Sequence, residues 1–229
     1  MMSHHSQFLN YKNMYYILDS AIKKVGVYPQ VTDVSPGFNW QAFEKTNREL
    51  SPVLNNTVPA PVIPMRTGAK VTDALSVVNP SWPFLTVNET LLRFLQGVRA
   101  DPLRIMPTTA VKKGVSYPYW LVAIDRVRPE YVDYQESRFI TGDILDSNGL
   151  FSDIFFSNAE ECTQFFQQHD YSRYIHATKL ILKEEIIQHD IFRLPRYTTP
   201  RYFVSDRFRE GVDREKITGL GFYPIESAI

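Results

Sequence analysis

The sequence has little cysteine, no excess of either charge and no long apolar run, and each absence narrows the choice of function. Cys162 is the single cysteine, so no intrachain disulfide can form and a reducing compartment is favoured. Lys and Arg number 25, as do Asp and Glu, whereas a general nucleic-acid binder would carry a basic excess. No segment approaches the roughly 20 apolar residues that span a bilayer. Residues 1–13 lack the apolar region of a secretory signal. We expect a cytoplasmic protein that binds neither membrane nor nucleic acid, with residues 1–13 as a disordered tail.

The compact motifs of catalytic and metal sites are also missing. No Gly-rich phosphate loop and no Gly-x-Ser-x-Gly elbow occurs. The five histidines do not have the spacing of metal ligands. Cys162 lies beside Glu160 and Glu161, whose carboxylates would raise the pKa of its thiol, which favours a packed cysteine over a nucleophile. The sequence therefore predicts no catalytic residue, no metal and no cofactor.

What the chain does contain is typical of a folded α+β protein. Its 229 residues are 44% hydrophobic and 14% aromatic, enough to bury a sizeable core. We expect one α+β domain over residues 14–229, with two packed lobes at 14–110 and 115–229 as an option. The expected architecture is a mixed, mostly antiparallel sheet with several helices packed on it.

Local patterns place the main elements. Apolar runs rich in branched and aromatic residues predict strands at 14–18, 103–106 and 120–124, and an alternating pattern predicts a long strand over 176–187 that includes Glu184 and Glu185. Thr86 with Glu89, and Ser157 with Glu160, have the spacing of capping boxes that open helices. The last forty residues predict a strand at 191, a strand ending at Ser205, a helix capped by Ser205, a Gly turn and a final strand.

One order of elements occurs twice. Residues 83–86, a helix and residues 103–107 form a strand–helix–strand unit that ends in proline, and residues 202–205, a helix and residues 221–224 form another. Two similar strand–helix–strand units are therefore expected. An ancient duplication and the chance recurrence of a common unit both explain the pattern.

Charge is uneven along the chain. Residues 125–170 carry ten acidic and three basic residues. This stretch is either a solvated acidic face or a docking surface for a basic partner. On the second interpretation, aromatic and acidic side chains together form the candidate partner-binding site, which is Glu130, Tyr131, Asp133, Tyr134, Glu136, Asp143 and Asp146.

A second concentration of charge lies near the C-terminus. It consists of Arg193, Arg196, Arg201, Arg207 and Arg209. These side chains could hold a phosphate or an acidic partner, or they could be solvated and salt-bridged. An enzyme with an unrecognised site would use them with Glu184, Glu185 or His189, and a structural or adaptor module is a further alternative.

Several segments carry a resemblance to a known family. They are residues 191–195, 202–208 and 218–224 at the end of the chain, residues 70–75 and 83–89 in the middle, and residues 15–18 at the start. In this pattern the chain resembles the bacterial polymorphic-toxin immunity proteins of the immunity-protein-11 type. The resemblance implies a stoichiometric inhibitor that binds and neutralises a cognate protein toxin in the cytoplasm. It assigns no binding residue and leaves the toxin and the oligomeric state open.

Overall fold

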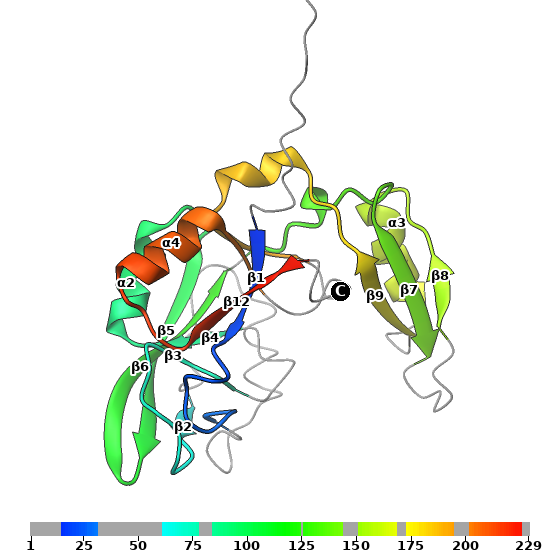
Figure 1. Ribbon diagram of the computed structural model, residues 1–229. Coiled ribbons are helices and arrows are strands. Elements are labelled where there is room, and N and C mark those ends of the chain that lie inside the picture. Colours follow the sequence, from blue (N-terminus) through cyan, green and yellow to red (C-terminus); the bar gives the residue numbers. More distant parts are fainter. Residues whose placement is uncertain are drawn as a thin grey trace, which may run out of the picture.

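The computed structural model describes residues 15–31, 61–77, 84–124, 126–143, 151–168, 173–194 and 202–225. Within these residues the chain forms three sheets, with mixed and antiparallel pairing, and three α-helices (Figure 1). The predicted α+β class is therefore confirmed. The tail at 1–13 lies outside the described residues.

The first sheet lies in the order β10-β11-β1-β12, and every pair in it is antiparallel. Because β1 lies antiparallel to both of its neighbours, β11 and β12 are parallel to each other and are joined by α4. The bounds are Tyr15–Ser20 for β1, Ile191–Arg193 for β10, Tyr202–Ser205 for β11, Asp206–Arg214 for α4 and Leu220–Pro224 for β12. The elements predicted for the last forty residues are all present, and Ser205 caps α4 by accepting from the Phe208 N–H at 3.2 Å.

The second sheet lies in the order β2-β5-β6-β4-β3, with only β2 parallel to its neighbour. Its strands β4 and β5 are parallel, are separated by β6 and are joined by α2. The bounds are Val62–Pro64 for β2, Ala74–Leu75 for β3, Leu85–Val87 for β4, Glu89–Gly97 for α2, Leu103–Lys112 for β5 and Val115–Ile124 for β6.

The two sheets contain the same four-stranded unit, which confirms the two similar units that the sequence predicted. The first unit is β3-β4-α2-β5 with β6 as the inner strand, and the second is β10-β11-α4-β12 with β1 as the inner strand. A constant 117 residues separates Asp73 from Asp190, Asn88 from Ser205, Leu103 from Leu220, and Pro107 from Pro224. The register also repeats, since Trp120 lies opposite Val87 and Pro107, and Tyr16 lies opposite Val204 and Pro224.

The helices of the two units, α2 and α4, start in the same way. The residue before each helix donates its backbone N–H to the carbonyl of an aspartate, Asn88 to Asp73 at 2.8 Å and Ser205 to Asp190 at 2.9 Å. Asn88 is also the N-cap of α2, because its Oδ1 accepts the Leu91 N–H at 3.1 Å. The prediction of Thr86 as the cap was wrong. Thr86 is a buried residue of β4, and Asn caps a helix at least as well as Thr.

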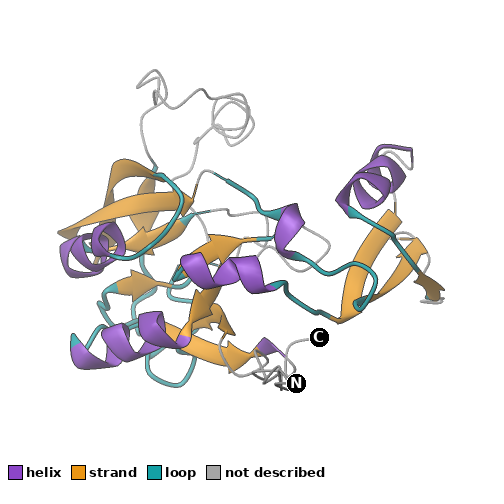
Figure 2. Cartoon of the chain, turned by 90° about the horizontal axis from the view of Figure 1, so that it is seen from above, coloured by secondary structure: helices purple, strands orange, loops and turns teal. Residues whose placement is uncertain are grey.

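The third sheet, in the order β8-β7-β9, lies with α3 to one side of the two units (Figure 2). The bounds are Arg138–Asp143 for β7, Ser152–Ile154 for β8, Ala159–Gln168 for α3 and Arg173–Lys179 for β9. Two short 3-10 helices flank it along the chain, η2 at Pro129–Tyr131 between β6 and β7, and η3 at Glu184–Gln188 between β9 and β10.

Two predictions in this region were wrong in detail. The cap of α3 is one residue later than expected. Asn158 Oδ1 accepts the Glu161 N–H at 2.9 Å, and a Glu161 carboxylate oxygen accepts the Ser157 N–H at 2.6 Å. The strand predicted over 176–187 ends at Lys179. After Lys179 the chain lies alongside η2, because Lys183 donates its backbone N–H to the Tyr131 carbonyl. Glu184 and Glu185 belong to η3 and not to a strand.

Strands from the two optional lobes, 14–110 and 115–229, pair with each other in the same sheets. β5 and β6 flank the suggested boundary near residues 111–114 and pair with each other over their full length. β1, from the start of the chain, is an inner strand of the sheet that ends it. One core also joins the second unit to the third sheet, with Ile17 and Phe203 in the same cluster as Phe139 and Ile175. A single domain over 14–229 stays our prediction.

Candidate functional site

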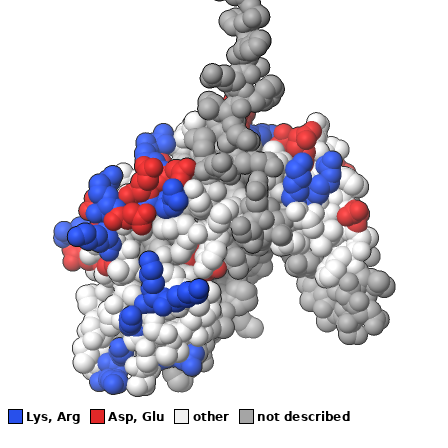
Figure 3. All heavy atoms as spheres, viewed as in Figure 1, with Lys and Arg blue, Asp and Glu red and all other residues white. Residues whose placement is uncertain are grey.

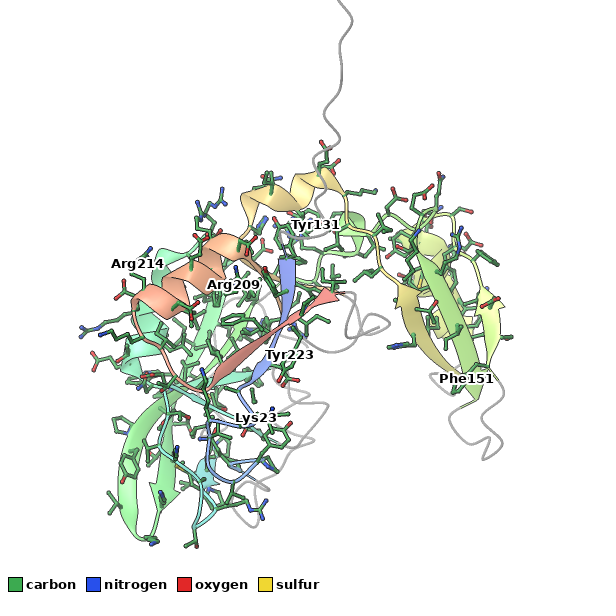
Figure 4. The ribbon with its side chains drawn as sticks, viewed as in Figure 1. Lys23, Tyr131, Phe151, Arg209, Arg214 and Tyr223 are labelled. Atoms are coloured by element: carbon green, nitrogen blue, oxygen red, sulfur yellow. The ribbon has the colours of Figure 1, made fainter. Side chains whose placement is uncertain are left out.

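The two tyrosines of the predicted partner-binding site are core residues. Tyr131 is 4% and Tyr134 5% exposed, so neither ring is available as a surface anchor. Tyr131 packs edge-on against Phe192 with ring centroids 5.9 Å apart, and Tyr134 stacks on Phe139 at 6.0 Å. These contacts place Tyr131 at the junction between the second unit and the third sheet (Figure 4). The physical reason is that an aromatic side chain among acidic residues fills an apolar gap as readily as it marks an interface.

The acidic residues of the same candidate site have different surroundings. Glu130 is paired with Arg126 at 3.0 Å and with Arg128 at 3.2 Å. Asp133 shapes a turn, because its Oδ1 accepts the N–H groups of Gln135 and Glu136, both at 3.1 Å. Glu136 is exposed. The side chain of Asp143 and the whole of Asp146 lie outside the described residues.

A buried network lies where η2, η3 and the loop after α2 meet. Arg128 donates from Nε to the Asp101 carboxylate at 2.8 Å, and its Nη2 bonds the other carboxylate oxygen. The Tyr131 hydroxyl lies 2.9 Å from His189 Nδ1, and burial, partly opposed by Asp101, lowers the pKa of His189. The arrangement superficially has the parts of an Asp–His relay. However, His189 Nε2 is 3.8 Å from Asp101, too far for a hydrogen bond, and the carboxylate is already held by Arg128. We interpret it as a structural ion-pair network.

Cys162 is fully buried in the core that lies under α3, as predicted for a packed thiol. Burial, and next the charge of Glu161, raise the pKa of Cys162 to about 12, so the thiolate that a nucleophile needs is strongly disfavoured. Across the described parts of the chain, no three His, Cys, Asp or Glu side chains are grouped as a metal site would require.

A groove of about 710 Å³ runs between α2 and α4, where the two units meet. Its apolar lining comes from both helices and the loops that follow them, with Phe94 packed edge-on against Phe208 at 5.2 Å. Gly211 permits this close approach, since a Cβ there would lie 2.7 Å from the Phe94 ring. Four arginines line the groove, which are Arg93, Arg99, Arg207 and Arg214. Acidic and basic side chains are seen intermingled over these helices in Figure 3.

The buried carboxylate of Asp190 binds two of these arginines, Arg99 and Arg207. Its side chain is 2% exposed, and its carboxylate accepts from Arg207 Nε at 2.9 Å and from the Arg99 backbone N–H at 2.9 Å and Nη2 at 3.2 Å. Arg207 Nη2 and the Ser205 hydroxyl bond the same carboxylate. Burial opposes the charged form, but the hydrogen bonds from Arg207 and Arg99 outweigh it and lower the pKa of Asp190 to about 2.

The arginine group expected from the sequence is divided in space. Of its three described members, only Arg207 lines the groove, while Arg193 lies over the Tyr202 ring and Arg209 lies over the Tyr16 ring and pairs with Asp206. Arg196 and Arg201 fall outside the described residues. The sequence analysis did not group Arg93, Arg99 and Arg214 with Arg207, although all four line the groove. The repeat spacing of 117 residues was the available signal, because it makes α2 and α4 equivalent helices of two units that share a core.

Comparison with known proteins gives one family. The model of the Imm11 immunity protein family matches residues 56–227, well over half of the chain. The match includes both helices of the groove and Asp190, and it begins after β1. No curated protein matches the chain. Among the helices that the structure describes, none has the length and apolar character needed to cross a bilayer. The chain belongs to the Imm11 immunity protein family.

Proposed function

We propose that this protein neutralises a cognate toxin in the cytoplasm by binding it in a stoichiometric complex, without turnover. The observation that carries the proposal is the family match over residues 56–227. The local chemistry supports a binding role. The buried thiol of Cys162 and the Asp101–Arg128 pair are both parts of the folded core, and neither is arranged to act on a substrate.

The acidic stretch 125–170 remains our proposal for the segment that meets a basic toxin, with different aromatic anchors. Phe151 and Phe155 flank β8 and are 56% and 64% exposed, with the exposed carboxylate of Asp153 between them. The Arg138 guanidinium lies 5.5 Å from the centre of the Phe155 ring. Exposed aromatic rings beside charged groups have the composition of interface hot spots. With Glu136 they take the role that the sequence gave to Tyr131 and Tyr134.

A pull-down from the native cell tests the function. A tagged copy of the chain is recovered at low salt, and proteins present in equimolar amount are identified by mass spectrometry. We expect one partner whose expression alone arrests growth and whose effect is cancelled by co-expression of this chain. Recovery of the chain without a stoichiometric partner, together with no protection by co-expression, would contradict the proposal.

One double variant tests this proposed surface. Glu136→Lys combined with Asp153→Lys reverses two exposed carboxylates and leaves the Asp133 turn and the buried Arg128 network intact. We expect unchanged far-UV circular dichroism and a weaker complex, chiefly through slower association. Full protection by this double variant would remove the acidic surface from the proposal and leave the immunity function standing.

A further inference from the structure

We propose that the groove between α2 and α4 docks an acidic segment of the partner protein, with a partner carboxylate held between Arg99 and Arg207. The inference rests on the proposed function only in identifying that partner as the toxin. It adds a second contact surface, of opposite charge to the exposed carboxylates of Glu136 and Asp153.

The first support is a pre-positioned pair of guanidinium groups. Arg99 comes from the loop after α2 and Arg207 from the first turn of α4, and Asp190 fixes both from beneath the groove. Their side chains are 50% and 56% exposed, so the face turned away from Asp190 is accessible. Nη1 of each guanidinium has no hydrogen-bond partner within the described residues and keeps its N–H donors for a ligand.

The second support is the balance of charge. The groove is lined by four arginines and by two carboxylates, Asp190 and Glu215. Arg93 and Arg214 each have an exposed acidic neighbour, Glu89 and Glu215. Among the described residues, Arg99 and Arg207 instead share the single negative charge of Asp190, so one of their two positive charges has no acidic partner there. A carboxylate that entered from a partner would complete this set.

The third support is the composition of the groove. Phe94, Val98, Phe208 and Ile217 supply its apolar lining between the arginines. Arginine and aromatic residues are enriched at protein interfaces, whereas lysine is depleted. A guanidinium also binds a carboxylate through two parallel N–H groups, which gives direction as well as charge. These features favour a side chain of a folded or extended protein partner over a loosely held free anion.

The test uses a double charge reversal at the edge of the groove. Arg93→Glu with Arg214→Glu alters two largely exposed side chains that do not touch Asp190, so the fold should be kept. The matched control is Lys113→Glu with Lys183→Glu, which makes the same change of charge at two exposed positions outside the groove. Both variants are checked for unfolding temperature, and binding is measured in the full chain.

Two probes are used, the toxin recovered by pull-down and a fluorescein-labelled peptide of alternating glutamate and phenylalanine. We expect the groove variant to bind both about tenfold more weakly or worse, with a shallower dependence on salt, and the control to bind as the wild type does. Equal binding by groove variant and control, or no binding of the peptide to the wild type, would overturn the proposal. Competition by millimolar inorganic phosphate with unchanged toxin binding would assign the groove to a free anion and also overturn it. If the wild-type chain fails to protect against the toxin, the proposed function falls, while the peptide still decides the groove.

Discussion

The first four-stranded unit is made from one continuous stretch of chain, and the second is made from both ends. In the first, β5 turns directly into β6 through Lys113 and Gly114, both with positive φ, as a tight hairpin requires. In the second, the inner strand is β1, which lies almost the whole length of the chain away from β12. The register is nevertheless the same. Register in these sheets is therefore set by which side chains must be buried and does not depend on the turn.

A second difference concerns the aspartate that precedes each unit. Each one fastens its own unit to the other, because Asp73 accepts the Thr218 N–H at 2.7 Å and Asp190 accepts the Arg99 N–H at 2.9 Å. Among the described residues, Asp190 also binds two guanidinium groups, whereas Asp73 binds Thr218 and Asn88. The arginine pair is thus a property added to the second unit, while the junction between the units is common to both.

The largest expected effect tests whether β1 is as integral as β6. Ile17 and Leu121 occupy equivalent positions in the two inner strands, and both are buried. Ile17→Pro should cost at least about 3 kcal/mol of unfolding free energy, since proline removes a backbone donor in a strand with neighbours on both sides. Leu121→Pro should cost about as much. Urea denaturation of the two variants makes the comparison, and a mild effect at Ile17 alone would show that β1 is a peripheral addition.

The next largest effect compares how much Asp190 and Asp73 contribute to the unfolding free energy. Asp190→Ala should cost about 2–4 kcal/mol, because it leaves Arg99, Arg207 and the Ser205 hydroxyl without their common acceptor. Asp73→Ala removes bonds to Thr218 and Asn88 that lie nearer the surface, and about 1 kcal/mol is expected. The midpoints of urea unfolding, at unchanged slope, measure both. Equal losses would mean that the arginine pair adds no stability to the second unit.

The pH dependence of stability follows from the lowered pKa of Asp190. A carboxyl whose pKa falls from about 3.9 in the unfolded chain to about 2 in the folded one stabilises the protein above pH 4. That contribution, on the order of 2 kcal/mol, is lost as the pH falls from 4 towards 2. Unfolding free energies of the wild type and Asp190→Asn over this range should converge as the acid form takes over. Parallel curves would assign the acid sensitivity to other carboxyls.

Local spacing predicted the elements of the C-terminal unit but not which distant residues meet in the groove, for one physical reason. Ser205 as a cap, the helix after it and the turn at Gly219 depend on neighbours within a few residues, and all were found. The position of β1 between β11 and β12 depends on burial across the whole chain. Arg207 was noticed, but its partner Arg99 lies more than a hundred residues earlier in the sequence.

The tyrosines illustrate the same limit from the other direction. Tyr131 and Tyr134 lie among acidic residues, a composition that suits an interface rim and also suits the seam between two packed sheets. Only the position of Phe139 and Phe192, which come from distant segments, decides between the two. The predicted caps were one or two residues too early, because a nearby asparagine caps the helix in place of the hydroxyl, as Asn88 and Asn158 do.

The smallest expected change in stability tests the packing contact between α2 and α4. Positions 94 and 211 are equivalent in the two units, yet one carries a phenylalanine and the other a glycine that makes room for its ring. Gly211→Leu should cost about 1 kcal/mol, since overpacking against Phe94 exceeds the gain in helix propensity. In the presence of Phe94→Ala the same change should stabilise, because the leucine then enters the space that the ring has left. A double-mutant cycle with urea unfolding measures the coupling, and strictly additive costs would mean that the ring of Phe94 does not rest on Gly211 in solution.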